Sequence, residues 1–128
     1  IMVNSQLSPM IVSAPIVTAV PIEIQSIEGL ISIGAQVNGI DPILANKIAF
    51  CESTTRQFSK NGEVLRGIKN PDDVGLFQIN EGYHIKPSQN LGYDIYTTEG
   101  NIDYAMWLIK NEGSRHWKAS QKCWDSQA

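Results

Sequence analysis

The chain has 128 residues and a formal net charge of −3, from ten basic and thirteen acidic side chains. Its hydrophobic fraction of 42% and charged fraction of 18% are ordinary for a globular protein, and its length suits one domain. No run of Lys or Arg stands out, so a nucleic-acid partner is not expected.

Residues 1–22 form an apolar segment that we interpret as an N-terminal linker. Pro9, Pro15 and Pro21 recur in it at six-residue intervals. Proline would break a helix here, and the run is shorter than the roughly 18 unbroken apolar residues of a membrane helix. We therefore expect no integral membrane segment, and a folded domain over residues 23–128.

Two amphipathic helices are expected at the start of the domain. The first begins near Glu23 and ends before Gly39. Its apolar face consists of Ile24, Ile27, Ile31 and Ala35. The second covers residues 42 to about 53, because Asp41 followed by Pro42 is typical of an N-cap with proline at the first helical position. Its inward residues are Leu44, Ala45, Ile48, Ala49 and Cys51.

The middle of the chain lacks a helical period and is expected to hold a small β-hairpin. Residues 56–80 contain turn signals at 60–63 and at 70–73. Residues 63–67 between them are predicted to form a short strand. Residues 74–80 then return to the core.

A third helix is expected over residues 98–112. Thr97 or Thr98 can cap it, and Gly113 ends it. Its inner face consists of Ile102, Ala105, Met106 and Ile109. A last short helix follows at about 117–123. The sequence therefore predicts a mainly α fold with a small β insert.

Glu52 is the carboxylate at the end of the otherwise apolar stretch AFCEST, residues 49–54. It lies four residues after Ile48 and seven after Ala45, so it projects from the inward half of its helix. It also lies in the last turn, where the helix dipole disfavours a negative charge. Both effects raise the pKa of a carboxyl group. The position suits a proton donor, and an ion pair with an arginine is the alternative.

Three motifs together resemble the lytic transglycosylase SLT domain of the lysozyme-like superfamily. They are Glu52-Ser53 at a helix end, the segment GLFQIN at 75–80, and Asn101-Ile102 opening a later helix. The resemblance spans roughly residues 23–124. It implies an α+β lysozyme-like fold whose β-hairpin flanks an active-site cleft. It also implies a monomeric muramidase, secreted or in the cell envelope, that cleaves the β-1,4 bond between N-acetylmuramic acid and N-acetylglucosamine in peptidoglycan.

The resemblance assigns roles to several side chains. Glu52 matches the general acid that protonates the leaving glycosidic oxygen. Gln78 and Asn80 match the segment beside the acid, where amides bond sugar hydroxyl and acetamido groups. Ser53 is a further candidate substrate contact. Tyr104 falls off the inner face of its helix and is expected to offer a flat ring to a sugar, with a core role as the alternative.

Asp73 leaves the product chemistry open. The segment DVGLFQIN at 73–80 also looks like the DYGIFQIN of animal-type lysozymes, whose Asp is the second carboxylate. Retaining glycosidases place such a group roughly 5 Å from the acid. Lytic transglycosylases do not strictly need one, because the substrate's own acetamido and 6-hydroxyl groups yield a 1,6-anhydro sugar. Alternatively, Asp72 and Asp73 form a turn after Pro71. We slightly favour the transglycosylase product over hydrolysis.

Cys51 and Cys123 are the only cysteines, and in an exported protein we expect them to pair. Two unpaired thiols are the alternative. A thiol hydrolase that uses Cys51 with His84 or His116 is disfavoured, because reactive thiolates favour helix N-termini. The two histidines lack metal-ligand spacing, so neither a metal nor another cofactor is expected. A catalytically silent peptidoglycan-binding module is the remaining alternative.

Overall fold

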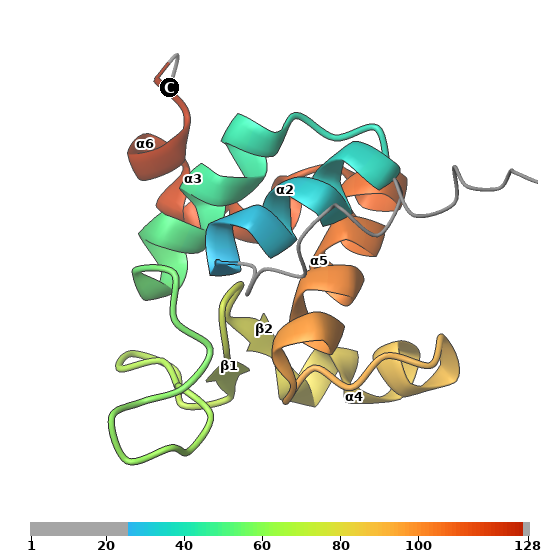
Figure 1. Cartoon of the computed structure of the whole chain (residues 1–128). Helices are drawn as coiled ribbons and strands as arrows, with labels where there is room; N and C mark the ends of the chain where they lie inside the picture. The colour runs from blue at the N-terminus through green and yellow to red at the C-terminus, as the bar shows by residue number, and fades with distance from the viewer. Residues whose placement is uncertain (1–25, 127–128) are drawn as a thin grey trace, which may run out of the picture.

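The computed structural model describes residues 26–126. The linker expected over residues 1–22 and the inward position expected for Ile24 lie outside this range. The described chain is mainly helical with a two-stranded antiparallel sheet, so the predicted class is confirmed at this level. Figure 1 shows the sheet and the long loop before it lying together on one side of the helices α2, α3 and α5.

The first two helices have the caps that their sequences suggest. Helix α2 spans Ile27–Val37, and the Ser26 hydroxyl accepts the Gly29 N–H at 3.0 Å, so this helix begins at residue 27 and not near residue 23. Helix α3 spans Pro42–Ser53, as predicted, and the Asp41 carboxylate accepts the Ile43 N–H at 2.9 Å. Their buried residues are Ile31, Ala35, Ala45, Ile48, Ala49 and Ser53.

The sheet lies after the position where a strand was predicted. Strand β1, Asp73–Val74, pairs with β2, Ile79–Asn80, in antiparallel register. The predicted strand at 63–67 was wrong, because this segment makes only isolated bridges, such as the one between Arg66 and Val74.

Helix α4, Glu81–Asn90, was not predicted. Its N-cap is Asn80, whose side-chain oxygen accepts the Tyr83 N–H at 3.2 Å. Ser88 is its only fully buried residue and Pro87 lies inside it. An apolar period, the main sequence signal for a helix, is therefore missing.

Helix α5 spans Thr98–Glu112, as predicted, with the Thr97 hydroxyl accepting the Gly100 N–H at 3.0 Å. It is buried on more than one face, since Tyr104 and Leu108 are as inaccessible as the predicted inner residues Ile102, Ala105 and Met106. The predicted inner residue Ile109 is only partly buried. The single predicted C-terminal helix is divided into the 3-10 helix η1, Arg115–Ser120, and α6, Gln121–Trp124. A kink at Trp117, whose φ of −110° is not helical, lies inside η1.

One apolar core joins these elements. Buried side chains from α2, α3, α5, the sheet and the C-terminal segment form a single cluster that includes Ile31, Ile48, Leu76, Phe77, Met106 and Trp117. Within residues 26–126, no helix has the length and apolar content that crossing a membrane requires.

Candidate active site

A cleft runs past Glu52 between the helices and the β region. Two cavities of about 400 and about 270 Å³ adjoin here, and Glu52, Asp73 and Gln78 line both of them. These three residues therefore mark the middle of one continuous cleft. A larger and mostly apolar cavity of about 530 Å³ lies elsewhere, over α2 and α3, and holds neither Glu52 nor Asp73.

The two arms of the cleft differ in charge. The arm between the end of α3 and the loop at 65–70 is lined by Arg56, Arg66 and Lys69. The opposite arm lies between β2, α4 and η1. It has no Lys or Arg among its lining residues, and its ring side chains are Tyr83, His84, His116 and Trp117. A long polar ligand lying in the cleft would thus contact cations at one end and aromatic side chains at the other.

Glu52 is half-buried at the end of α3, and its Oε2 accepts a hydrogen bond of 2.5 Å from the Ser120 hydroxyl. Burial raises the pKa of the Glu52 carboxyl; the hydrogen bond from Ser120 lowers it, and the negative charge of Asp73 raises it, so the pKa lies above its ordinary value. No Lys, Arg or His among residues 26–126 forms an ion pair with Glu52. The arginine ion pair considered from the sequence is therefore not formed.

Asp73 faces the cleft from β1. Its Oδ1 accepts a hydrogen bond of 3.0 Å from the Asn80 side chain directly opposite on β2. The turn before it is made by Asn70, whose side chain accepts the Asp72 N–H at 3.0 Å. The Asn80 side chain also caps α4 through its oxygen. Both ends of its amide therefore have partners within the protein, and its role in the structure is to position Asp73.

Gln78 is held beside Glu52 by a tight turn. Its φ of 50° is left-handed, and its side-chain N–H donates to the Gly75 carbonyl at 2.9 Å. Gly75 itself has a φ of 76°, and a Cβ there would lie 2.5 Å from side-chain atoms of both Asn101 and Gln57. Only glycine fits this position, which explains the glycine that opens the GLFQIN motif.

Two buried side chains hold the same turn from behind. The Gln57 oxygen accepts the Leu76 N–H at 2.9 Å. The Asn101 oxygen accepts the Phe77 N–H at 2.9 Å, and its NH₂ donates to the Val74 carbonyl at 3.0 Å. These backbone groups are buried and need partners. Asn101 thus links α5 to the site, whereas sequence reasoning did not single out Gln57.

Two predicted substrate contacts have other roles in the structure. The buried Ser53 hydroxyl donates to the Ala49 carbonyl at 3.1 Å and accepts the Arg56 N–H at 3.0 Å, so it serves the helix end. Tyr104 is 1% exposed and stacks on Trp107. The expectation that its ring faces a sugar was wrong, because α5 is buried on that side as well.

Tyr104 instead supports His84, which the sequence analysis considered only as a partner for Cys51. The Tyr104 hydroxyl lies 2.7 Å from His84 Nδ1. Because the buried hydroxyl needs an acceptor, Nδ1 accepts its proton and Nε2 carries the N–H. Burial lowers the pKa of His84, the positive charge of protonated His116 lowers it further, and Glu112 raises it. His84 therefore lines the cleft as a neutral donor at neutral pH.

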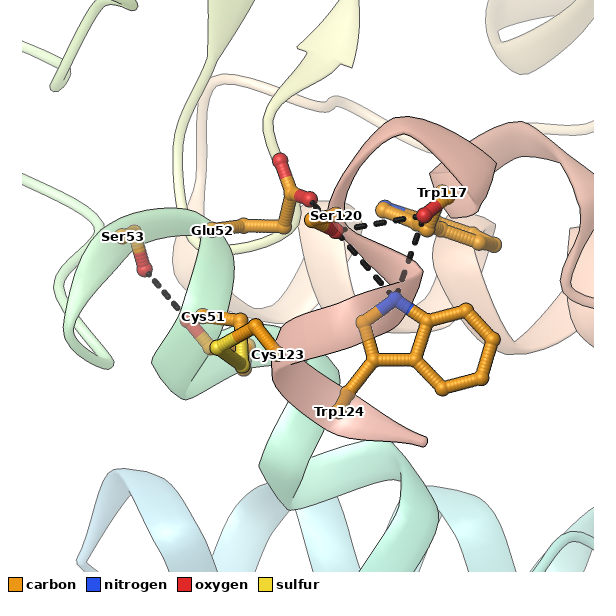
Figure 2. The surroundings of a disulfide bond; sticks show 8 residues. Cys51, Glu52, Ser53, Trp117, Ser120, Cys123 and Trp124 are labelled. Atoms are coloured by element: carbon orange, nitrogen blue, oxygen red, sulfur yellow. Dashed lines mark hydrogen bonds between the residues drawn. A yellow bond between two sulfur atoms is a disulfide. The ribbon is translucent and has the colours of Figure 1, made fainter. Parts of the chain in front are cut away.

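Cys51 and Cys123 form a disulfide, as predicted. The bond joins α3 to α6, one residue before Glu52 and three residues after Ser120 (Figure 2). Both cysteines are consumed by it, so Cys51 is not a thiol nucleophile in this state.

The remaining polar groups of the site include carboxylates, amides, imidazoles and the cations of one arm. Within the described range 26–126, no three His, Cys, Asp or Glu side chains gather as a metal site requires. Comparisons of the chain with protein-family models, with curated proteins and with solved structures find no match. The resemblance to the SLT domain therefore depends on the three sequence motifs alone.

Proposed function

We propose that this domain is a muramidase that cleaves the β-1,4 bond between N-acetylmuramic acid and N-acetylglucosamine in peptidoglycan, on a lysozyme-like fold. The observation that carries the proposal is Glu52, a half-buried carboxyl group with a raised pKa and no ion-pair partner among residues 26–126, in the middle of an open cleft beside Asp73. A general acid needs this combination, because it must be protonated when substrate binds and must reach the scissile oxygen.

In the proposed reaction, Glu52 transfers its proton to the glycosidic oxygen as the bond from that oxygen to C1 of the muramyl sugar breaks. The negative charge of Asp73 stabilises the positive charge that develops at C1. The 6-hydroxyl of the same sugar then attacks C1, and its proton returns to Glu52. The product is a 1,6-anhydro end. The SLT-like order of the motifs favours this lytic transglycosylase outcome.

Hydrolysis by a lysozyme mechanism is the second candidate. Asp73 favours it, because Asn80 holds its side chain toward the cleft that also contains Glu52. A carboxylate fixed in this way suits a nucleophile or a charge stabiliser in a retaining glycosidase. In this case a water molecule attacks C1 and its proton returns to Glu52.

Several other side chains support a glycan ligand. The Gln78 amide and the Nε2–H of His84 line the cleft and suit hydroxyl and acetamido oxygens. The cations Arg56 and Lys69 at the other end suit the carboxylates of the peptides that peptidoglycan strands carry. The disulfide fits an oxidising location, so we propose a secreted or cell-envelope enzyme that acts as a monomer.

The variant Glu52→Gln tests the proposal. It should remain folded and lose at least about 100-fold in the rate of peptidoglycan lysis, because it lacks the proton donor. Glu63→Gln is the matched control, since Glu63 is an exposed glutamate in a turn and should leave lysis unchanged. Full lysis by folded Glu52→Gln protein would contradict the proposal. Binding of peptidoglycan by the unmodified protein without release of fragments would favour a silent binding module.

The masses of the released fragments and the variant Asp73→Asn separate the two product chemistries. A transglycosylase should release 1,6-anhydro ends, and Asp73→Asn should then cost less activity than Glu52→Gln. Fragments one water heavier, together with an Asp73→Asn protein as inactive as Glu52→Gln, would identify a hydrolytic lysozyme.

A further inference from the structure

Ser120 lies at the junction of η1 and α6, and its hydroxyl caps neither helix. It reaches instead to Oε2 of Glu52, 68 residues earlier in the chain, at 2.5 Å. Figure 2 shows the Glu52 carboxyl with one oxygen directed at Ser120 and the other directed away from it. No group in residues 26–126 donates a hydrogen bond to that second oxygen, Oε1.

The Ser120 oxygen is itself fixed in place by the C-terminal segment. The indole N–H of Trp124 donates to it at 3.2 Å and to the Trp117 carbonyl at 3.1 Å. Ser120 also lies 3.2 Å from the Trp117 carbonyl, a second acceptor for its proton. The hydroxyl oxygen is therefore held by a donor from α6, and of the two acceptors for its proton Oε2 of Glu52, at 2.5 Å, is nearer than the Trp117 carbonyl.

The disulfide links the two chain segments that carry Glu52 and Ser120. Cys51 directly precedes Glu52, and Cys123 follows Ser120 by three residues. A bond so close to both partners restricts how far α6 can move from the end of α3. The contact between Ser120 and Glu52 is thus a built feature of the fold and not a chance meeting of two surface groups.

We propose that Ser120 is a positioning residue for the general acid, whose hydroxyl binds Oε2 so that Oε1 carries the transferable proton toward the substrate. The claim that Oε1 donates a proton to substrate rests on the proposed muramidase function. The claim that Ser120 holds Oε2 rests on the hydrogen bonds alone. A neutral carboxyl group has one oxygen that accepts and one that carries the proton. A donor at Oε2 stabilises the form in which the proton is on Oε1.

The same hydrogen bond acts against the effect of burial on the Glu52 pKa. Burial raises this pKa and the bond from Ser120 lowers it, so loss of the hydroxyl should raise the pKa further. The other groups that face Glu52 are Asp73 from β1 and, along the cationic arm, Arg56, Arg66 and Lys69. Along the second arm they are Tyr83, His84 and His116. The substitution Ser120→Ala removes none of these groups.

The test is Ser120→Ala in the full chain, with Ser114→Ala as the control. Ser114 precedes η1 and its side chain makes no capping hydrogen bond. The pKa of Glu52 is read from the NMR titration of its carboxyl carbon, assigned with Glu52→Gln. We expect an upward shift in Ser120→Ala and none in Ser114→Ala. With peptidoglycan strands as substrate, kcat should fall by about 10- to 100-fold with little change in KM, and the alkaline limb of the pH profile should move to higher pH.

An unchanged or lower Glu52 pKa in folded Ser120→Ala protein overturns the proposal, even if lysis falls. If this variant does not fold, Ser120→Cys replaces the hydroxyl with a weaker donor, and a smaller upward shift is expected; no shift overturns the proposal in the same way. The titration needs no turnover, so it separates the two claims. An active Glu52→Gln protein would refute the muramidase proposal and leave the Ser120 contact to be judged by the titration alone.

Discussion

Glu52 occupies a position that is unfavourable for an ionised carboxylate. It is half-buried in the last turn of α3, near Asp73, and Ser120 is the only neutral donor that reaches it among residues 26–126. Burial and the charge of Asp73 outweigh the hydrogen bond from Ser120, so the pKa of Glu52 is raised and its protonated form is favoured. The protein therefore loses stability at this residue when the carboxyl group ionises, as is common where function and stability compete.

We expect Glu52→Gln to raise the free energy of unfolding near neutral pH. The pKa of Glu52 is higher in the folded than in the unfolded state, so the folded state binds more protons over the interval between the two values. The penalty is absent below the ordinary carboxyl pKa, grows as pH rises through that value, and becomes constant above the raised pKa. Urea denaturation of both proteins between about pH 3 and pH 8 measures it. A difference that does not grow with pH would contradict this account.

At the residue scale, sequence reasoning selected Glu52, Asp73 and Gln78, and all three line the cleft. Glu52 could be inferred from helix position and motif, and Asp73 and Gln78 from the segment that contains them. Ser120 and His84 could not, because their roles depend on partners 68 and 20 residues away in the chain. Tyr104 was wrongly assigned as a sugar contact, because the helical period identifies only one buried face and α5 is buried on more than one.

Elements with strong local signals were predictable. Helix α3 begins with the Asp41 cap and Pro42, helix α5 lies between the Thr97 cap and Gly113, and both were located correctly. Helix α4 lacks a buried apolar stripe and contains a proline, Pro87. Each strand of the sheet has only two residues. Contacts with the rest of the domain contribute more to such elements than their local sequences do, so these sequences give weak signals.

The turn between β1 and β2 is an element whose sequence requirement can be measured. Gly75→Ala should lower the free energy of unfolding by about 2–4 kcal/mol, because the new Cβ meets Asn101 and Gln57 and the φ of 76° is unfavourable for alanine. Gly62→Ala is the control, since its φ of 87° is similar but no atom lies within 4 Å of its Cβ. It should cost only about 1–2 kcal/mol of backbone strain. Equal losses in chemical denaturation would show that the close contact at Gly75 is unimportant.

At the scale of the whole molecule, the cleft lies where distant parts of the chain meet. Glu52 comes from the end of α3, Asp73 from β1, and Ser120 from the junction of η1 and α6. The disulfide spans 72 residues and encloses nearly all of these parts in one covalent loop. Its removal should therefore affect both global stability and the geometry of the site.

The double variant Cys51→Ala/Cys123→Ala should be less stable than the unmodified protein. Closing a loop of 72 residues contributes roughly 4 kcal/mol in the chain-entropy model, which corresponds to a fall in Tm of about 10–20 °C for a domain of this size. Calorimetry in the presence and absence of a reductant measures it: the reductant should lower the Tm of the unmodified protein and leave that of the double variant unchanged. Well below both melting temperatures, the double variant should still lyse peptidoglycan more slowly, because α6 and Ser120 are no longer tied to the residue before Glu52. Full activity with a lowered Tm would show that the disulfide stabilises the fold but does not position the site. An unchanged Tm would show that the packing of α6 on α3 is sufficient for stability without the disulfide.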